Sequence, residues 1–274
     1  MYDCILITGG AGFVGATLAI ALTRQFPDTR VIALDNLHRR GSELNLPRLA
    51  RAGVRFVHGD IRVPEDLLAL LPEHPGLLIE CSAEPSAQAG YGGSPEYVIR
   101  TNLLGCFHCL ELARQAGADV IFMSTSRVYP FEALNQLPVV EEETRFALAA
   151  AQTVPGVSAA GISEAFPLAG ARSLYGMTKL AAELMIEEYA DAYGLRYIIN
   201  RYSGGCYNVG GGLANSLSRR ETTGCAPAQP HPLSPGASGQ KSGSRTWASV
   251  HGHATGEVAR GILVCSAASG RALL

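Results

Sequence analysis

The chain has 274 residues, of which 47% are hydrophobic and 17% charged, and its formal net charge is −2. This length suits one sizeable domain, or one domain with a small lobe. The near-neutral charge would not attract nucleic acid or an anionic membrane, so we expect neither as a partner.

The amino-terminal residues lack a basic region, and the apolar run that follows them stops at Thr8. We therefore expect no signal peptide and no transmembrane span. The seven cysteines show no framework spacing, and the Cys106-x-x-Cys109 pair lies in a helical pattern without a second pair. Buried thiols, no metal site and a reducing cytoplasmic setting are the expectations.

Short apolar runs alternate with helical patterns along most of the chain. The predicted strands are 4–8, 31–35, 54–58, 77–81, 120–124 and 196–200, and the predicted helices are 13–26, 64–71, 95–116 and 173–193. Undivided apolar strands that alternate with helices predict an α/β fold, a doubly wound parallel sheet with both faces covered. Ligands of such sheets bind beyond the carboxyl ends of the strands.

The first predicted strand runs into a glycine-rich turn that opens the first helix. Its glycines fit both G-x-x-G-x-x-G and G-x-G-x-x-G. Such glycines permit a tight turn and a close backbone approach to a pyrophosphate, and the helix start supplies free N–H groups. The residues expected to contact a dinucleotide here are Gly9, Gly12, Phe13, Val14 and Gly15.

An acidic residue, Asp35, closes the second predicted strand twenty residues beyond Gly15. A carboxylate there accepts hydrogen bonds from the adenosine ribose hydroxyls and repels a 2′-phosphate, which favours NAD over NADP. Asn36 belongs to the same predicted contact. Arg39 and Arg40 follow closely and can accommodate a phosphate, so NADP stays open as the alternative.

The next two predicted strands also end in residues that a cofactor could touch. Asp60 and Ile61 follow the third strand, and Ser82 and Ala83 follow the fourth. Asp60 is placed to reach the adenine region, and the alternative is a loop carboxylate that caps a turn.

Lys179 is one of only two lysines in a chain with twenty arginines, and it lies four residues after Tyr175. A helix places these two side chains on one face. Lys is a compact and tunable charge, whereas Arg is planar and keeps its proton. A nearby ammonium favours the ionised phenol, and such a phenol is a general acid or base. The alternative is an exposed helical pair without consequence.

Two regions outside these motifs have a weaker pattern. The stretch between Tyr129 and Ser173 carries an acidic cluster at Glu141–Glu143 that predicts a solvated turn. The stretch as a whole is expected to form part of a substrate wall.

Beyond Asn200 the chain becomes glycine-rich, and residues 224–246 are expected to be flexible. A last helical pattern spans about 256–267.

Together these motifs resemble the extended short-chain dehydrogenase/reductase superfamily. The matching segments are Thr8-Gly9-x-x-Gly12-x-x-Gly15, Asp35, Gly59-Asp60, Asn102 in Thr-Asn-Leu-Leu-Gly, Ser124-Thr125-Ser126-Arg127-Val128-Tyr129 and Tyr175-x-x-x-Lys179. Within the superfamily the chain resembles nucleotide-sugar epimerases of the CDP-paratose/CDP-tyvelose 2-epimerase type. Asp35-Asn36-Leu37, Arg39-Arg40-Gly41 and Phe56-Val57-His58-Gly59-Asp60-Ile61-Arg62 carry that narrower likeness.

The resemblance implies a Rossmann-fold NAD-binding domain over residues 1–201. Tyr175 would act as the acid and base, and Lys179 would support Tyr175 and bind the nicotinamide ribose. Thr125 would orient the reacting oxygen, unless it only caps the turn after its strand. Asn102 would belong to the cofactor site. The partners implied are a nucleotide-sugar, with a CDP-sugar as the narrower expectation, and a second copy of the chain in a homodimer.

Two features of the sequence separate the reaction types. Dehydratases of the superfamily resemble the pattern Thr-Asp-Glu, whereas Ser126 and Arg127 follow Thr125 here. A simple reductase would favour NADP, which Asp35 disfavours. Epimerisation with transient hydride transfer to bound NAD is therefore the predicted function, with a dehydratase or reductase as alternatives.

The resemblance fails after Tyr202. The family's segment that closes over the nicotinamide looks absent, and a glycine-rich piece that is similar to a later part of the family follows directly. Residues 202–274 are thus expected to form a reduced, partly irregular substrate lobe. The alternative hypothesis is a catalytically impaired remnant that at most binds NAD.

Overall fold

The computed structural model describes residues 2–143, 146–202 and 247–248. These residues fall into two compact units. The first contains residues 2–128, 172–202 and 247–248, and the second contains residues 129–143 and 146–171. The predicted flexible stretch and the predicted last helix lie outside the described residues, so the predicted lobe over 202–274 stays a prediction.

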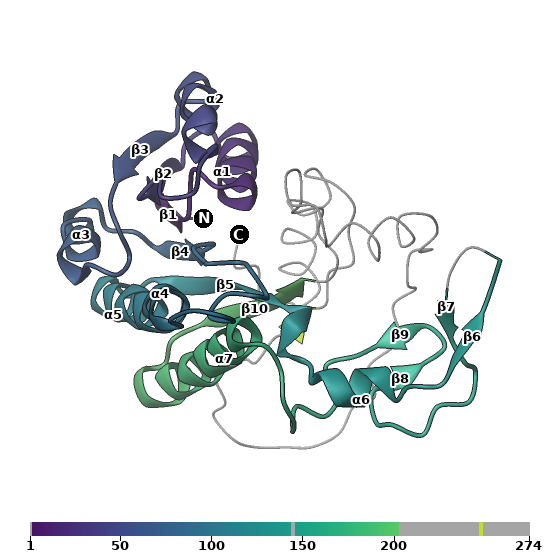
Figure 1. The fold of residues 1–274 in the computed structure, drawn as a ribbon. Helices are drawn as coiled ribbons and strands as arrows, with labels where there is room; N and C mark the ends of the chain where they lie inside the picture. Colours follow the sequence, from purple (N-terminus) through teal and green to yellow (C-terminus); the bar gives the residue numbers. More distant parts are fainter. Residues whose placement is uncertain (1, 144–145, 203–246, 249–274) are drawn as a thin grey trace, which may run out of the picture. The chain divides into compact units, whose positions relative to one another are not determined.

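The first unit is built on one parallel sheet (Figure 1). Its strands are β1 (Cys4–Thr8), β2 (Arg30–Asp35), β3 (Arg55–His58), β4 (Leu77–Glu80), β5 (Asp119–Thr125), β10 (Tyr197–Tyr202) and the short β11 (Trp247–Ala248). They are ordered β11-β10-β5-β4-β1-β2-β3, and every neighbouring pair is parallel. The doubly wound sheet is thereby confirmed, and its strand order reverses between β1 and β4, where such sheets bind ligands.

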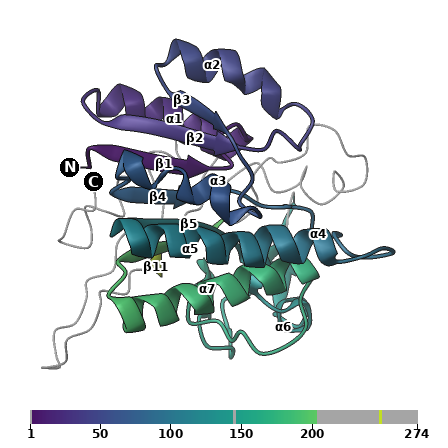
Figure 2. The same cartoon turned by 90° about the vertical axis from the view of Figure 1, so that its left-hand side faces the viewer.

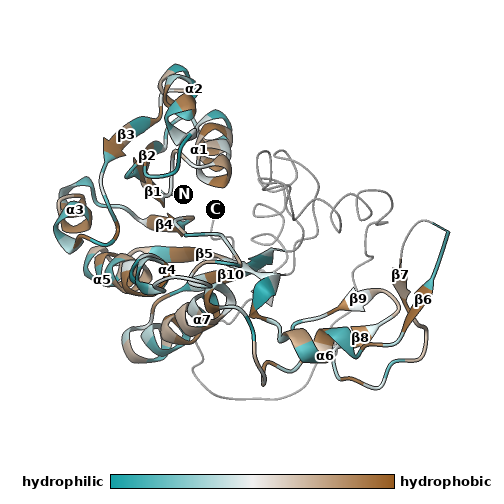
Figure 3. Cartoon of the chain, in the orientation of Figure 1, coloured by the Kyte–Doolittle hydropathy of each residue, from teal (hydrophilic) through white to brown (hydrophobic). Residues whose placement is uncertain are grey.

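The central strands are apolar because both of their faces are covered. All residues of β1, β4 and β5 are buried, and polar side chains occur mainly where these strands end. The hydrophobic colour in Figure 3 follows the strands and the sheet-facing sides of the helices. Undivided apolar strands of this kind are typical of parallel sheets.

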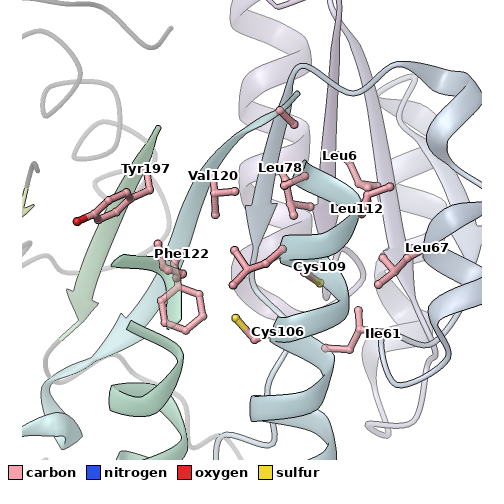
Figure 4. Close-up of a cluster of buried hydrophobic side chains, with 14 of the residues drawn as sticks. Leu6, Ile61, Leu67, Leu78, Cys106, Cys109, Leu112, Val120, Phe122 and Tyr197 are labelled. Carbon is pink, nitrogen blue, oxygen red and sulfur yellow. The ribbon is translucent and has the colours of Figure 1, made fainter. Parts of the chain in front are cut away.

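Helices cover both faces of the sheet (Figure 2). One core packs the sheet against α1 (Phe13–Gln25) and α2 (Leu46–Arg51). The other core lies under α3 (Pro64–Leu68), α5 (Gly105–Ala116) and α7 (Leu174–Tyr193). Figure 4 shows the second core, in which the thiols of Cys106 and Cys109 are buried as predicted.

The predicted helix over 95–116 is interrupted. The structure divides it into α4 (Glu96–Ile99), a π-helical turn at Arg100–Leu104, and α5. The π turn contains Asn102, whose side chain binds groups outside the helix. Such turns are rare and occur often at functional sites. The predicted helix 64–71 is shorter, since α3 ends at Leu68 and a 3₁₀ turn follows at Leu71–Glu73.

The second unit consists of α6 (Phe131–Asn135) and two short antiparallel hairpins. The hairpins pair β6 (Val139–Glu141) with β7 (Phe146–Leu148) and β8 (Val157–Ser158) with β9 (Gly161–Ile162). Phe166 is buried and meets Tyr129 edge to face, with ring centroids 5.5 Å apart. The residues of the predicted acidic turn are exposed, and the predicted substrate wall stays a prediction.

A buried ion pair joins α7 to the sheet of the first unit. Arg201 on β10 donates to both carboxylate oxygens of Glu183, with its closest contact at 2.7 Å. The hydroxyl of Ser124 on β5 donates to the same carboxylate. The side chains of Glu183 and Arg201 are only 1% and 5% exposed, so neither charge is hydrated. Removing one partner of such a pair leaves a buried charge without compensation.

We expect Glu183→Gln to lower the free energy of unfolding by about 3 kcal/mol, because Arg201 would keep its charge in a dry site. Urea denaturation measures the change. The control is Glu188→Gln, which alters an exposed residue of the same helix and should shift stability by less than about 0.5 kcal/mol. Equal effects of the two substitutions would contradict this account.

Candidate active site

The glycine turn after β1 is packed too closely for side chains. Gly9 has a φ of 62°. A Cβ on Gly15 would lie 2.2 Å from the Gly9 carbonyl oxygen, and one on Gly12 would lie 3.1 Å from that oxygen. Helix α1 begins at Phe13, and its N-cap residue, Gly12, has no side chain that could cap it. The bare turn at the start of a helix therefore fits a pyrophosphate.

The carboxylate of Asp35 holds the turn against β2. Its Oδ2 accepts a hydrogen bond from the Ala11 amide at 3.0 Å, and its Oδ1 accepts one from the Leu37 amide at 2.8 Å. Each carboxylate oxygen can accept further hydrogen bonds. Asp35 is thus fixed beside the glycine turn with acceptor capacity left for ribose hydroxyls, and the residues present fit the predicted cofactor.

Asn36 and Asp60 lie together at the ends of β2 and β3. The Asn36 side chain donates to Asp60 Oδ2 at 2.9 Å, and Arg62 forms an ion pair with the same oxygen at 2.6 Å. The Arg62 guanidinium also lies 5.0 Å from the centroid of the Tyr97 ring. Burial alone would raise the pKa of Asp60, but the hydrogen bonds from Arg62 and Asn36 hold it well below its usual range. The predicted adenine contact of Asp60 stays a prediction.

The other predicted cofactor residues lie in two settings. A Cβ on Gly9 would lie 2.8 Å from the Ser82 nitrogen, so the glycine turn directly adjoins the half-buried Ser82 and Ala83. Ile61 points into the hydrophobic core (Figure 4), and its carbonyl oxygen lies 2.8 Å from His108 Nδ1. The structure therefore places Ser82 and Ala83 at the glycine turn, whereas the side chain of Ile61 is buried in the hydrophobic core.

Asn102 connects two parts of the site. Its side-chain oxygen accepts from the Glu84 amide at 2.7 Å, and its amide nitrogen donates to the Glu84 carbonyl at 3.1 Å and to Thr178 Oγ1 at 3.2 Å. Asn102 therefore ties the loop after β4 to α7, and its predicted contact with the cofactor stays a prediction. Sequence reasoning missed the role of Thr178, which no local pattern marks.

The Tyr175–Lys179 pair lies at the start of α7 and is buried. Ser173 caps the helix by accepting from the Gly176 amide at 3.0 Å. Tyr175 is 9% exposed and Lys179 is 2% exposed, so the alternative of an exposed pair is wrong. A Cβ on Gly176 would lie 2.1 Å from the Arg127 carbonyl oxygen, which shows how closely α7 meets the turn after β5.

Thr125 lies at the end of β5 on that turn. It is 7% exposed, and its Oγ1 accepts a hydrogen bond from the Arg127 amide at 3.1 Å. This bond is the turn cap that we considered as the alternative. The hydroxyl proton is still available as a donor, because the cap uses only a lone pair.

Glu80 is the main residue that sequence reasoning missed. It ends β4, its side chain is 3% exposed, and its Oε2 lies 3.5 Å from Lys179 Nζ. Burial raises the pKa of Glu80. Burial lowers the pKa of Lys179, but the charge of Glu80 reverses this effect and the net pKa is raised. The sequence offered one signal, a carboxylate at the end of an apolar strand. Such a carboxylate is buried with its strand, and a buried carboxylate requires a partner.

The fold and site together define a Rossmann-fold domain whose site fits a dinucleotide. The glycine turn lies at the reversal of strand order, Asp35 follows β2, and a buried Tyr–Lys pair lies beyond β5. The chain belongs to the NAD-dependent epimerase/dehydratase family, whose sequence model matches residues 5–206. This membership confirms the predicted superfamily and the predicted cofactor, NAD.

Known relatives include both epimerases and dehydratases. The chain is 32% identical over 203 residues to the CDP-paratose 2-epimerase of Salmonella typhi, covering 73% of this chain and 56% of the relative. It is 28% identical over 199 residues to a dTDP-glucose 4,6-dehydratase of Mycobacterium tuberculosis, covering 73% and 52%. The chain thus spans about half the length of the curated relatives it matches.

A solved structure supports the same assignment of fold. The structure of UDP-glucose 4-epimerase from Brucella ovis in complex with NAD has a TM-score of 0.54 and 26% identity, covering 74% of this chain and 52% of that chain. Within the described residues of our chain, no helix is both long and apolar enough to cross a membrane. The expected homodimer stays a prediction.

Stability should depend on the ionised carboxylate of Asp60 at acid pH. Because its pKa is lowered in the folded state, the unfolded chain binds this proton more readily, and the stabilisation is present above about pH 4 and is lost as the pH falls further. We expect Asp60→Asn to cost about 1 kcal/mol at neutral pH and progressively less below about pH 4. Urea denaturation across this range measures the difference. Asp28→Asn, an exposed control, should show no such trend. A cost for Asp60→Asn that does not vary with pH would refute the assignment.

Proposed function

We propose that this chain is an NAD-dependent nucleotide-sugar epimerase with Tyr175 as the general acid and base. One observation carries the proposal: the Tyr175–Lys179 pair is buried against a turn, Ser126–Val128, that holds no carboxylate. A tyrosine with a lysine can move a hydroxyl proton, while elimination of water requires further acids at this turn. The similarity to a CDP-paratose 2-epimerase supports the narrower proposal of a CDP-sugar substrate.

The residues proposed to hold NAD come from the ends of the strands. The start of α1 beside the glycine turn would bind the pyrophosphate, and Asp35 would bind the adenosine ribose. When bound, NAD supplies a reversible acceptor for a hydride from a sugar carbon. Lys179 and Asn102 would define the nicotinamide end of the site, since Lys179 of α7 contacts Glu80 of β4 and Asn102 joins the loop after β4 to α7.

The chain's own residues would move one proton in each direction. Tyr175 would take the proton of a sugar hydroxyl while the carbon beside it is oxidised, and would return that proton when the carbon is reduced on its other face. Lys179 would stabilise the phenolate that is present before the proton is taken and again after it is returned. The hydroxyl of Thr125 would donate to the reacting oxygen and fix its position. No net oxidation results.

The two alternatives make different demands on the chain. A dehydratase would need acids after Thr125, where Ser126 and Arg127 stand, although dehydratases occur among the relatives. A remnant that only binds NAD is the alternative that follows from the family segment that looks absent after Tyr202. The first alternative predicts loss of water from the sugar, and the second predicts no turnover.

The first measurement is the NAD content of the purified, monodisperse chain, followed by a panel of nucleotide-sugars assayed by NMR for inverted stereocentres. We expect bound NAD, an epimerised product, and a loss of at least about a hundredfold in rate for Tyr175→Phe, which cannot transfer the proton. An NAD-loaded protein that leaves every sugar unchanged would refute the epimerase. A dehydrated product would support the dehydratase.

The preference for NAD depends on the negative charge of Asp35. We expect Asp35→Ser to weaken NAD binding about tenfold and to strengthen NADP binding, because repulsion of the 2′-phosphate is removed and Arg39 and Arg40 lie close along the chain. Fluorescence titration with both cofactors measures the ratio. Asp3→Ser, which changes an exposed acid outside the strand ends, is the control. An unchanged ratio in Asp35→Ser would contradict the role assigned to this carboxylate.

A further inference from the structure

Glu80 places a carboxylate in the dry interior of the sheet. It ends β4, where it is in register with Thr8 of β1 and Phe122 of β5. It lies two residues after Leu78, so it faces the same core as Leu78, under α5 and α7. A carboxylate buried there is costly unless a charge or hydrogen bonds compensate it.

The compensating charge comes from α7. Lys179 Nζ lies 3.5 Å from Glu80 Oε2 and 4.0 Å from the centroid of the Phe122 ring. The ammonium is therefore held between a carboxylate and the negative face of an aromatic ring. This site holds the compact charge of lysine, so Lys179 has a second set of contacts besides its proximity to Tyr175.

The other titratable groups around this pair carry no charge that could replace Glu80. In the described part of the chain, Tyr175 on α7 and Cys106 on α5 act on Lys179 together with Glu80. Cys81 and Cys109 lie near Glu80, and burial raises the pKa of all three thiols. These thiols are thus neutral near pH 7.

We propose that Glu80 is a positioning residue that keeps Lys179 protonated and fixed beside Phe122, so that a full positive charge is available to Tyr175. This role rests on the proposed function, in which Lys179 supports the phenolate. Without Glu80, burial of the ammonium would favour the neutral amine, and a neutral amine stabilises a phenolate far less.

The composition of the chain makes the charge of Lys179 directly measurable. Only Lys179 and Lys241 are lysines, so a protein labelled with ¹³Cε-lysine gives two signals, which Lys241→Arg assigns. Titration by NMR reports the protonation of each amine. We expect the titration midpoint of Lys179 to lie about one pH unit or more lower in Glu80→Gln than in the parent. Glu65→Gln, which removes an exposed charge on α3, should leave the Lys179 midpoint in place.

An unchanged Lys179 midpoint in Glu80→Gln would overturn the proposal. A merely structural role of Glu80 would lower stability without shifting this midpoint. Should Glu80→Gln fail to fold, the double variant Glu80→Gln/Lys179→Gln decides the question in urea denaturation. We then expect this double variant to fold, because it leaves no uncompensated charge in the dry site. A double variant that also fails to fold would overturn the pairing.

The titration needs neither sugar nor turnover, so the two proposals can fail separately. A protein inert toward every nucleotide-sugar, but with Lys179 coupled to Glu80, would refute only the epimerase. An active epimerase whose Lys179 titrates independently of Glu80 would refute only the role of Glu80.

Discussion

The docking of α7 against the ends of β5 and β10 is the interaction on which the candidate site depends. The missing side chain of Gly176 lets the helix meet the Arg127 carbonyl, and Ser173 begins the helix at that point. Two turns farther along the helix, Glu183 binds Arg201 and Ser124. A helix held at both places cannot slide or rotate freely, so Tyr175 and Lys179 keep one position relative to the strand ends.

The buried face of α7 carries charges of both signs, and each of them pairs with an opposite charge on a strand of the sheet. Lys179 and Glu183 are four residues apart and therefore share a face of the helix. The first pairs with Glu80 of β4 and the second with Arg201 of β10. Exchanging such pairs for apolar residues often costs no stability, so stability alone does not account for both of them. The Glu183 pair orients the helix, and the Glu80 pair controls the charge of a residue in the proposed chemistry.

The sequence predicted the parts of this arrangement that depend on local pattern. The apolar strands were found because a covered parallel sheet tolerates few polar residues, and the glycine turn was found because backbone contact excludes side chains. Glu80 was missed because its partner lies 99 residues away, and one carboxylate after an apolar run resembles the start of a loop. The π turn at Arg100–Leu104 was missed for a similar reason, since the helical pattern continues through it while Asn102 bonds outside the helix.

The residues proposed for proton transfer and for NAD belong to the first unit, and that unit compensates its own buried charges. Glu80, Lys179, Glu183 and Arg201 are satisfied within the described strands and helices of this unit. Binding of NAD and the coupled charge of Lys179 therefore rest on contacts that exist before any sugar is bound. Recognition of the sugar is a separate requirement, because the chain matches only about half the length of its curated relatives. The first unit can hold NAD and a charged Lys179 before the sugar arrives, but catalysis also requires residues that hold the sugar in place. Cofactor binding and turnover therefore have to be measured as independent properties of this chain.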